Sequence, residues 1–137
     1  MPRTVNSVWT KVEDVARTEA VIVPPQMRLR EVSAVMARHD IGAVVVGSAN
    51  RALGILSERD VITALARGAD PDSAAAAGSM SVDVVSVRPS DTLYDAAVDM
   101  LDLGIRHVAV LDTAGVVVGM VSVRDLLRPL LTGALET

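Results

Sequence analysis

Apolar residues recur in two places along the chain at spacings that put them on one face of an α-helix. These positions are Leu29, Val32, Val35 and Met36 in the first place, and Leu93, Ala96, Ala97 and Met100 in the second. Ser90, Asp91 and Thr92 precede the second run and are typical N-cap residues. The pattern therefore predicts two amphipathic helices, one in each half of the chain.

Short apolar runs surround each predicted helix. A β-branched run that closes at a proline precedes each helix, at residues 21–23 and 85–87. Two further apolar runs follow each helix, at residues 43–46 and 53–56 and again at 108–111 and 116–121. Turn residues separate the members of each pair, so each pair is expected to form adjacent strands of a largely buried sheet. A second helix is expected to open at Ser57 and at Ser122, which gives the order β-α-β-β-α twice.

An internal repeat relates the two sets of elements. Leu93 follows Leu29 at an offset of 64 (93 − 29 = 64), and Gly119 follows Gly54 at 65 (119 − 54 = 65), because one extra residue has entered the turn before Gly119. The repeat predicts an N-terminal segment 1–11, a first repeat 12–67, a linker 68–77, a second repeat 78–129 and a tail 130–137. The small residues of the linker are consistent with a short helix.

The predicted architecture follows from the size of the repeats. A unit of about 60 residues buries too little surface to be comfortably stable alone. We therefore expect an α/β (α+β) fold in which two pseudo-symmetric β-α-β-β-α units pack sheet to sheet, share a core and leave clefts between them. Sheet edges and helices would also offer a face for a homodimer, a common form of soluble oligomers.

Composition narrows the classes of function. Of the 137 residues, 50% are hydrophobic and the net charge is −4, which argues against intrinsic disorder. The chain has no cysteine for a disulfide or a thiolate zinc site, no apolar signal segment at its start and no stretch long enough to span a membrane, so we expect a cytoplasmic protein. It also lacks the basic stripe and the stacking aromatics with which proteins bind nucleic acids.

The motif Ser-x-Arg-Asp stands in each repeat where the last strand passes into the last helix. Its residues are Ser57, Arg59 and Asp60 in the first repeat, and Ser122, Arg124 and Asp125 in the second. Free N–H groups and the helix dipole favour phosphate at such a position, and the Ser and Arg side chains can donate to it. The Asp can accept from both hydroxyls of a ribose. The motif thus predicts a nucleotide-binding corner in each repeat.

A capping box explains the same residues without a ligand. In a capping box the Ser side chain accepts from a backbone N–H of the first turn, and the acidic side chain returns to the Ser N–H. Duplication copies a cap as faithfully as it copies a binding site, so repetition does not decide between the two. On the residues alone, both interpretations stay open.

The ordered set of motifs resembles the tandem CBS domain pair (cystathionine-beta-synthase domain, Bateman module) over nearly the whole chain. The segments that carry the resemblance are 14–15, 21–25, 41–46, 54–60, 85–89, 105–110 and 119–125. The length leaves no room for an attached enzyme or channel, so the resemblance implies a free-standing pair. Members of this family sense energy or metabolite state by binding adenosine-type ligands, such as AMP, ADP, ATP or S-adenosylmethionine, in the clefts between repeats, and they are not catalytic.

The resemblance further implies crossed clefts, in which each corner faces the other repeat. One cleft would combine Ser122, Arg124 and Asp125 with Val21, Ile41, Gly42 and Ala43, and the other would combine Ser57, Arg59 and Asp60 with Val85, Ile105 and Arg106. Backbone groups of Val21 and Val85 would pair with an adenine edge. Arg106 and His107 stand where basic residues of the family often reach phosphates, whereas the first repeat has Gly42 and Ala43 there. We therefore expect sites of unequal affinity, although His107 has a structural imidazole as its alternative role.

The remaining polar and sulfur-containing residues are assigned to the surface or the core. His39 does not match His107, because 107 − 39 = 68 rather than 64, and two unmatched histidines without cysteine make a poor metal site. The residues expected at the surface are His39, Arg28, Arg30, Arg38, Asp95, Asp99 and Asp102. Those expected in the core are Met27, Met36, Met100 and Met120. Trp9 could pack over a repeat or anchor a dimer.

These observations predict a regulatory module that binds an adenine nucleotide and thereby changes its conformation or its interaction with a protein target. The alternative is a ligand-free structural or interaction dimer of the same fold, whose clefts are empty. An enzyme is not expected, because the chain has two His, no Cys and no nucleophile–base arrangement at a recognisable spacing. No resident cofactor or metal is expected, and neither a nucleic acid nor a membrane is an expected partner.

Overall fold

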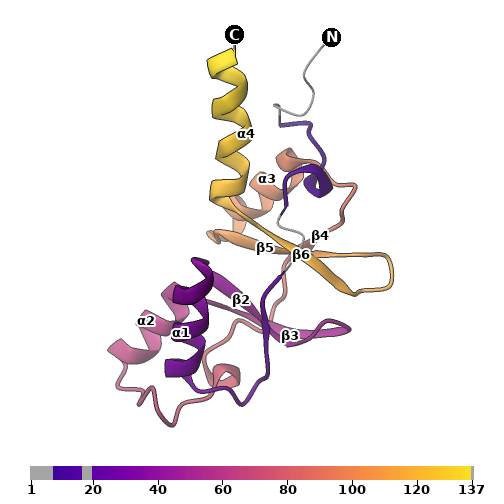
Figure 1. Cartoon of the computed structure of the whole chain (residues 1–137). Coiled ribbons are helices and arrows are strands. Elements are labelled where there is room, and N and C mark those ends of the chain that lie inside the picture. The colour runs from indigo at the N-terminus through magenta and orange to yellow at the C-terminus, as the bar shows by residue number, and fades with distance from the viewer. Residues whose placement is uncertain (1–7, 17–19, 137) are drawn as a thin grey trace. The chain divides into compact units, whose positions relative to one another are not determined.

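The computed structural model describes residues 8–16 and 20–136, which fall into two compact units. The first unit is Val21–Val84, and the second combines Met1–Ala20 with Val85–Thr137. Within the described residues each unit contains a three-stranded sheet and two α-helices (Figure 1). The predicted mixed α/β class and the repeated β-α-β-β-α order are confirmed, while the packing of the units sheet to sheet stays a prediction.

The first unit follows the predicted order closely. Its elements are β1 (Ile22–Val23), α1 (Leu29–His39), β2 (Ala43–Ser48), β3 (Arg51–Ser57) and α2 (Glu58–Ala66). The sheet has the order β1-β2-β3, with β1 parallel and β3 antiparallel to β2. Helices α1 and α2 lie beside each other in this unit (Figure 1).

The second unit repeats this arrangement. Its elements are β4 (Ser86–Val87), α3 (Leu93–Leu103), β5 (His107–Leu111), β6 (Val117–Ser122) and α4 (Val123–Glu136). The sheet order is β4-β5-β6, again with one parallel and one antiparallel pairing. Helix α4 continues through Pro129, where we expected the second repeat to end. A proline inside a helix removes one backbone hydrogen bond, and here the helix runs on despite that loss.

The predicted apolar faces of the helices form the cores of the two units. In α1 the buried residues are Leu29, Val32 and Met36, and in α3 they are Leu93, Ala96 and Met100. Each set packs against buried valines of its own sheet. Met27 lies half-buried against the first core, and Met120 is half-buried in β6.

Each unit is completed by a short turn that comes before the first strand of the other unit in the chain. Val12, in a 3₁₀ turn (η2, Val12–Asp14), is fully buried in the core of the second unit, and its N–H donates to the carbonyl of Asp91 at 2.7 Å. Ala76, in the matching turn (η3, Ala76–Gly78; 76 − 12 = 64), is fully buried in the first unit. The expected start of the first repeat at residue 12 therefore does not coincide with the start of the first compact unit.

The linker is anchored to the first unit along its length. Backbone N–H groups of Leu29 and Ala76 donate to Ala74 and Met27, respectively. Arg30, which we expected only to be solvated, forms a two-pronged ion pair with Asp72, in which Nη2 lies 3.0 Å from Oδ2. The predicted short helix of the linker is the single 3₁₀ turn η3.

Trp9 lies at the surface of the second unit. Its ring contacts that of Tyr94 on α3, with centroids 5.2 Å apart, and the side chain is 64% exposed. Residues 1–7 of the predicted N-terminal segment lie outside the described residues. Within the described part of the chain, no helix has the length and apolar character needed to cross a membrane.

Candidate functional site

Each Ser-x-Arg-Asp motif lies at a corner where an antiparallel strand pair meets a helix. Ser57 ends β3 and caps α2, and it pairs with Ala43 at the start of β2. The N–H of Glu58 donates to the carbonyl of Gly42 at 2.9 Å. The structure thus brings Gly42 and Ala43 next to the motif of their own repeat.

The second unit builds the same corner from matching residues. Ser122 ends β6 and pairs with His107 at the start of β5. The N–H of Val123 donates to the carbonyl of Arg106 at 3.0 Å. Arg106 and His107 therefore lie beside the Ser122 motif, with Arg106 exposed and His107 half-buried.

Both motifs form capping boxes. The Ser57 N–H donates to Asp60 Oδ2 at 2.8 Å, and the Asp60 N–H donates to Ser57 Oγ at 3.2 Å. In the second unit the corresponding distances between Ser122 and Asp125 are 2.8 Å and 3.3 Å. The Ser57 hydroxyl also donates to Asp60 Oδ2 at 2.9 Å. The capping interpretation is thus confirmed for both motifs.

These boxes change the expected chemistry of the helix N-termini. The N–H groups of Ser57, Glu58 and Asp60 all donate within the unit. The prediction of a cluster of free N–H groups for phosphate at the start of α2 is therefore wrong. In this first turn the N–H of Arg59 is left for a ligand. The boxes use Oδ2 of Asp60 and of Asp125, which leaves Oδ1 of each as an acceptor.

Val21 and Val85 occupy equivalent places in the two sheets. Their carbonyls accept from the N–H groups of Val45, at 2.9 Å, and Ala109, at 3.1 Å. An adenine edge at these positions would therefore form its hydrogen bond mainly with the backbone N–H of Val21 or Val85. Ile41 and Ile105 are half-buried and donate their N–H groups back to Met36 and Met100 at the ends of α1 and α3.

The side chains that we expected to contact phosphate differ in exposure. Arg59, Arg106 and Arg124 are exposed, as is His39, whose assignment to the surface is confirmed. The crossed combinations of residues join the two units, so they stay a prediction. No group of three or more His, Asp or Glu able to hold a metal ion occurs among the described residues.

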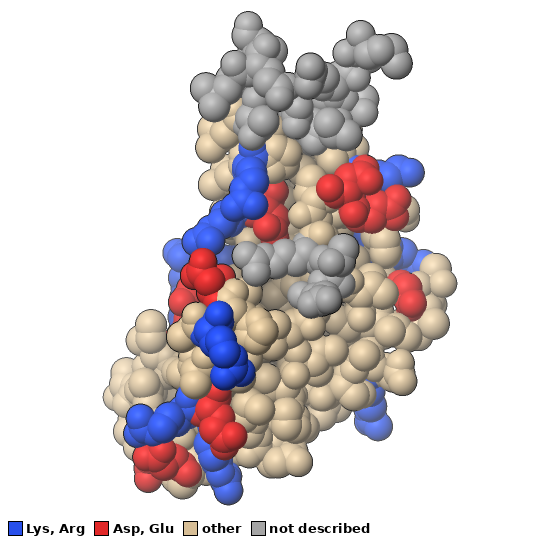
Figure 2. Space-filling model, in the orientation of Figure 1, with Lys and Arg blue, Asp and Glu red and all other residues tan. Residues whose placement is uncertain are grey.

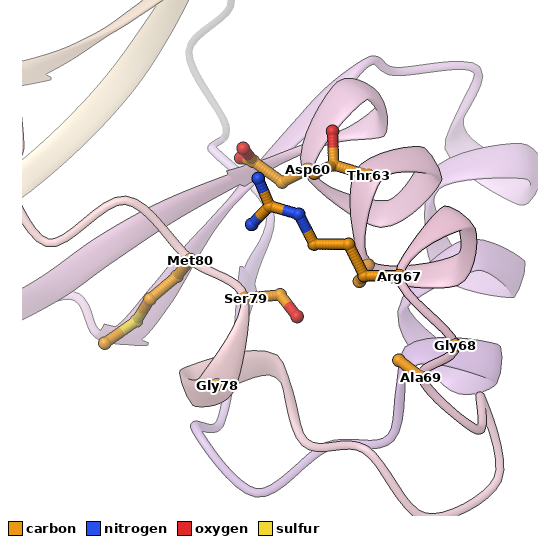
Figure 3. Close-up of a pocket in the computed structure, with 9 residues that line it drawn as sticks. Asp60, Thr63, Arg67, Gly68, Ala69, Gly78, Ser79 and Met80 are labelled. Atoms are coloured by element: carbon orange, nitrogen blue, oxygen red, sulfur yellow. The ribbon is translucent and has the colours of Figure 1, made fainter.

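A hollow of about 510 Å³ extends from Asp60 along α2 within the first unit (Figure 3). Residues Asp60, Thr63, Ala64 and Arg67 line it from α2 and its end, Gly68 and Ala69 line it from the linker, and Gly78, Ser79 and Met80 line it from the segment that follows the linker. Sequence reasoning found Asp60 but missed Thr63, Arg67 and Ser79. The helical spacing of Asp60, Thr63 and Arg67 could have shown that they share a face, whereas Gly78, Ser79 and Met80 were expected to belong to the second repeat.

Charged side chains are mixed on the surface. Figure 2 shows Lys and Arg interleaved with Asp and Glu on the face in view, without a continuous basic patch there. This distribution matches the net charge of −4 and offers no broad cationic surface on that face for a polyanion.

Comparison with known proteins gives a consistent result. The CBS domain matches the chain twice, at residues 12–67 and 76–132. An uncharacterized 17.7 kDa protein of Acidianus ambivalens is 38% identical over 123 residues, which cover 89% of this chain and 74% of that protein.

Solved structures agree with this match. The CBS-domain containing protein ATU1752 of Agrobacterium tumefaciens is 30% identical, with a TM-score of 0.81 over 89% of this chain and 94% of that one. The CBS domain protein PAE2072 of Pyrobaculum aerophilum, solved in complex with AMP, is 28% identical, with a TM-score of 0.81 over 93% and 99% of the two chains. With both repeats matched and the fold shared, the chain belongs to the CBS domain family.

Proposed function

We propose that this chain is a regulatory module that binds an adenine nucleotide of the AMP, ADP or ATP class at its two Ser-x-Arg-Asp corners. The observation that carries the proposal is the duplicated corner, in which each capping box leaves one carboxylate oxygen unused. That oxygen, Oδ1 of Asp60 or Asp125, can accept from ribose hydroxyls. The AMP complex of PAE2072, a relative of the same fold, supports this class of ligand.

The ligand would act through the conformations of the module. A bound nucleotide shifts a conformational equilibrium only if it binds one state more tightly than the other. In the proposed crossed arrangement, Asp60 would face Val85, Ile105 and Arg106, Asp125 would face Val21 and Ile41, and each ligand would bridge the two repeats. Nucleotide binding would then change their relative position and, through it, the interaction with a protein target.

A ligand-free interaction protein is the second candidate function, and the capping boxes favour it. Thr92 and Asp95 form a third box at the start of α3, with a distance of 3.0 Å from the Thr92 N–H to Asp95 Oδ2. That box lacks the Arg of the other two and does not follow a strand. Because the chain builds such a box where no corner exists, helix capping alone is a sufficient reason for the Ser and Asp residues.

We further expect self-association through the last helix of each repeat. Ile62 on α2 is 66% exposed, and its counterpart Leu127 on α4 (127 − 62 = 65) is 51% exposed. Covering such side chains in a homodimer would remove apolar surface from water. Sedimentation velocity should give a dimer for the parent and a monomer for Ile62→Glu with Leu127→Glu. A 14.4 kDa monomer for the parent at high concentration would contradict this expectation.

Calorimetric titration tests the nucleotide proposal. The nucleotide-free protein is titrated with AMP, ADP, ATP and S-adenosylmethionine, beside the double variant Asp60→Asn with Asp125→Asn. Asn retains an acceptor for the box but loses the second carboxylate oxygen, so we expect saturable binding by the parent and none by the double variant. Asp95→Asn, which alters the third box, serves as the control and should bind like the parent. Absence of heat with all four compounds would favour the ligand-free alternative.

A further inference from the structure

The hollow of the first unit, here called the α2 groove, extends beyond the corner that contains Asp60. It runs from Asp60 past Thr63 to Arg67, and Gly78 and Ser79, which follow the linker, form part of its other wall. Its volume of about 510 Å³ lies in the range of small-molecule pockets, about 300–1,000 Å³. The groove therefore has room for more than a ribose at Asp60.

Side chains provide the polar recognition in the α2 groove. The N–H groups of Gly78, Ser79 and Met80 already donate to carbonyls of Ala75 and Ala76. Figure 3 shows the Arg67 side chain reaching from the end of α2 back across the groove, with its guanidinium on the side of Asp60. The Ser79 side chain extends into the groove from the segment that follows the linker. The groove thus places an acceptor, Asp60, and a cation, Arg67, within one hollow.

The fold does not require this combination of residues, as the matching positions of the second unit show. At the repeat offsets, Thr132 stands in place of Arg67 (132 − 67 = 65), Asp14 in place of Gly78 (78 − 14 = 64) and Val15 in place of Ser79 (79 − 15 = 64). The ribose acceptor Asp125 is nevertheless retained in the second repeat. The combination of Arg67, Gly78 and Ser79 is therefore found in the first unit alone, although the second unit has a cation, Arg128, in place of Thr63 (128 − 63 = 65).

We propose that the α2 groove binds the oxyanion on the 5′ arm of the ligand whose ribose is held at Asp60, with Arg67 as its counter-charge and Ser79 as a hydrogen-bond donor. This inference rests on the proposed function, which places the ribose at Asp60. The N-terminus of α2 offers little competition for the oxyanion, because Ser57, Glu58 and Asp60 use their N–H groups within the unit. A phosphate or a carboxylate provides the required chemistry.

Three variants, two of which form a matched pair, isolate the charge in the groove. Arg67→Gln removes the cation and keeps polar character. Gly78→Asp introduces the carboxylate that the second unit carries at the matching position, Asp14, and Gly78→Asn introduces a neutral side chain of the same size. A Cβ at Gly78 meets no atom within 4 Å, so both substitutions at Gly78 are compatible with the fold. All variants are made with Asp125→Asn, so that the titration reports on the first-repeat corner.

Calorimetric titration with AMP, S-adenosylmethionine and adenosine gives the decisive readout. We expect Arg67→Gln and Gly78→Asp to lower the affinity for AMP by at least about tenfold, which corresponds to the loss of one hydrogen bond to a charged group. The affinity for adenosine should fall by less than about twofold. Gly78→Asn should bind AMP like the parent. Equal loss for AMP and S-adenosylmethionine would show that the groove accepts either oxyanion, whereas loss for one alone identifies the oxyanion that it binds.

The two proposals fail in different ways. If AMP and adenosine bind but respond alike to Arg67→Gln, or if neither responds, the groove does not hold the oxyanion while nucleotide binding stands. If none of the three compounds binds the parent protein, the proposed function is wrong, and the groove proposal is wrong with it. Thermal unfolding of each variant checks that a loss of affinity does not arise from a loss of fold.

Discussion

Shortening Val12 to Ala should destabilise the second unit, although Val12 comes before Val21, where the first unit begins in the chain. Val12 is 0% exposed and packs in a core cluster with Val87, Leu93 and Val121. The substitution removes two methyl groups, worth about 0.8 kcal/mol each by transfer, and leaves a cavity. We expect the free energy of unfolding to fall by about 1.5 to 3 kcal/mol, a substantial part of the total of about 5 to 15 kcal/mol that is usual for a domain.

Urea denaturation measures this loss, and hydrogen exchange locates it. For a slope of about 2 kcal/mol per molar urea, the midpoint should fall by roughly 1 M. Amides of α3 and β5 should lose protection, and amides of β2 and β3 should keep it. Val118→Ala is the matched control, because Val118 is 38% exposed, and it should change the free energy of unfolding by less than about 0.5 kcal/mol.

Two results would refute this reasoning. A loss in Val12→Ala no larger than that in Val118→Ala would show that Val12 is not a core residue. A loss of protection confined to the strands of the first unit would show that the segment Val12–Asp14 stabilises the first unit, rather than the second.

Two further predictions concern the linker. A Cβ at Gly54 would lie 2.5 Å from the carbonyl oxygen of Ser81, which accepts a hydrogen bond from the Ile55 N–H at 3.0 Å. Gly54→Ala should therefore disrupt the pairing of Ile55 with Ser81, destabilise the protein by about 1 to 3 kcal/mol and expose the Ser81 amide to exchange, whereas Gly78→Ala should be close to neutral. The hydrogen bond from Arg30 lowers the pKa of Asp72 in the folded protein below its ordinary value. The stabilisation of the linker by this ion pair is therefore fully present above the pKa of Asp72 in the unfolded chain, and it is lost as the pH falls through the lower pKa of Asp72 in the folded protein. The protection factors of the linker amides, which correct for the intrinsic pH dependence of exchange, should fall over this pH range in the parent but not in Asp72→Asn. Protection factors of the parent that do not change with pH would contradict this prediction.

Periodicity and repetition predicted most of the secondary structure. The apolar spacing of Leu29, Val32 and Met36 identified the buried face of α1, because burial in a helix follows its turn. Strand pairs were recognisable from apolar runs separated by turn residues. The end of the last helix was not predicted, and α4 runs to Glu136 with Pro129 inside it, because a proline lowers the stability of a helix without always ending it.

Tertiary pairing was beyond the reach of the pattern. Nothing in the local sequence tells which unit a short segment such as Val12–Asp14 completes, since that depends on contacts with residues far along the chain. For the same reason, the sequence did not show that Gly78 and Ser79 form a wall of the α2 groove. It also made the N-terminus of α2 look open to phosphate, because the carbonyl of Gly42 that takes the Glu58 N–H becomes visible only in the folded sheet.

The measurement that tests the central claim most directly is the stoichiometry of AMP binding to the single variants Asp60→Asn and Asp125→Asn. If each corner holds the ribose of one nucleotide, each variant should lose the site to which its own Asp contributes, with the other site and the thermal stability of the protein retained. If both variants bind AMP with the affinity and stoichiometry of the parent, the two carboxylates serve only as helix caps, and the nucleotide-binding account of this chain is wrong.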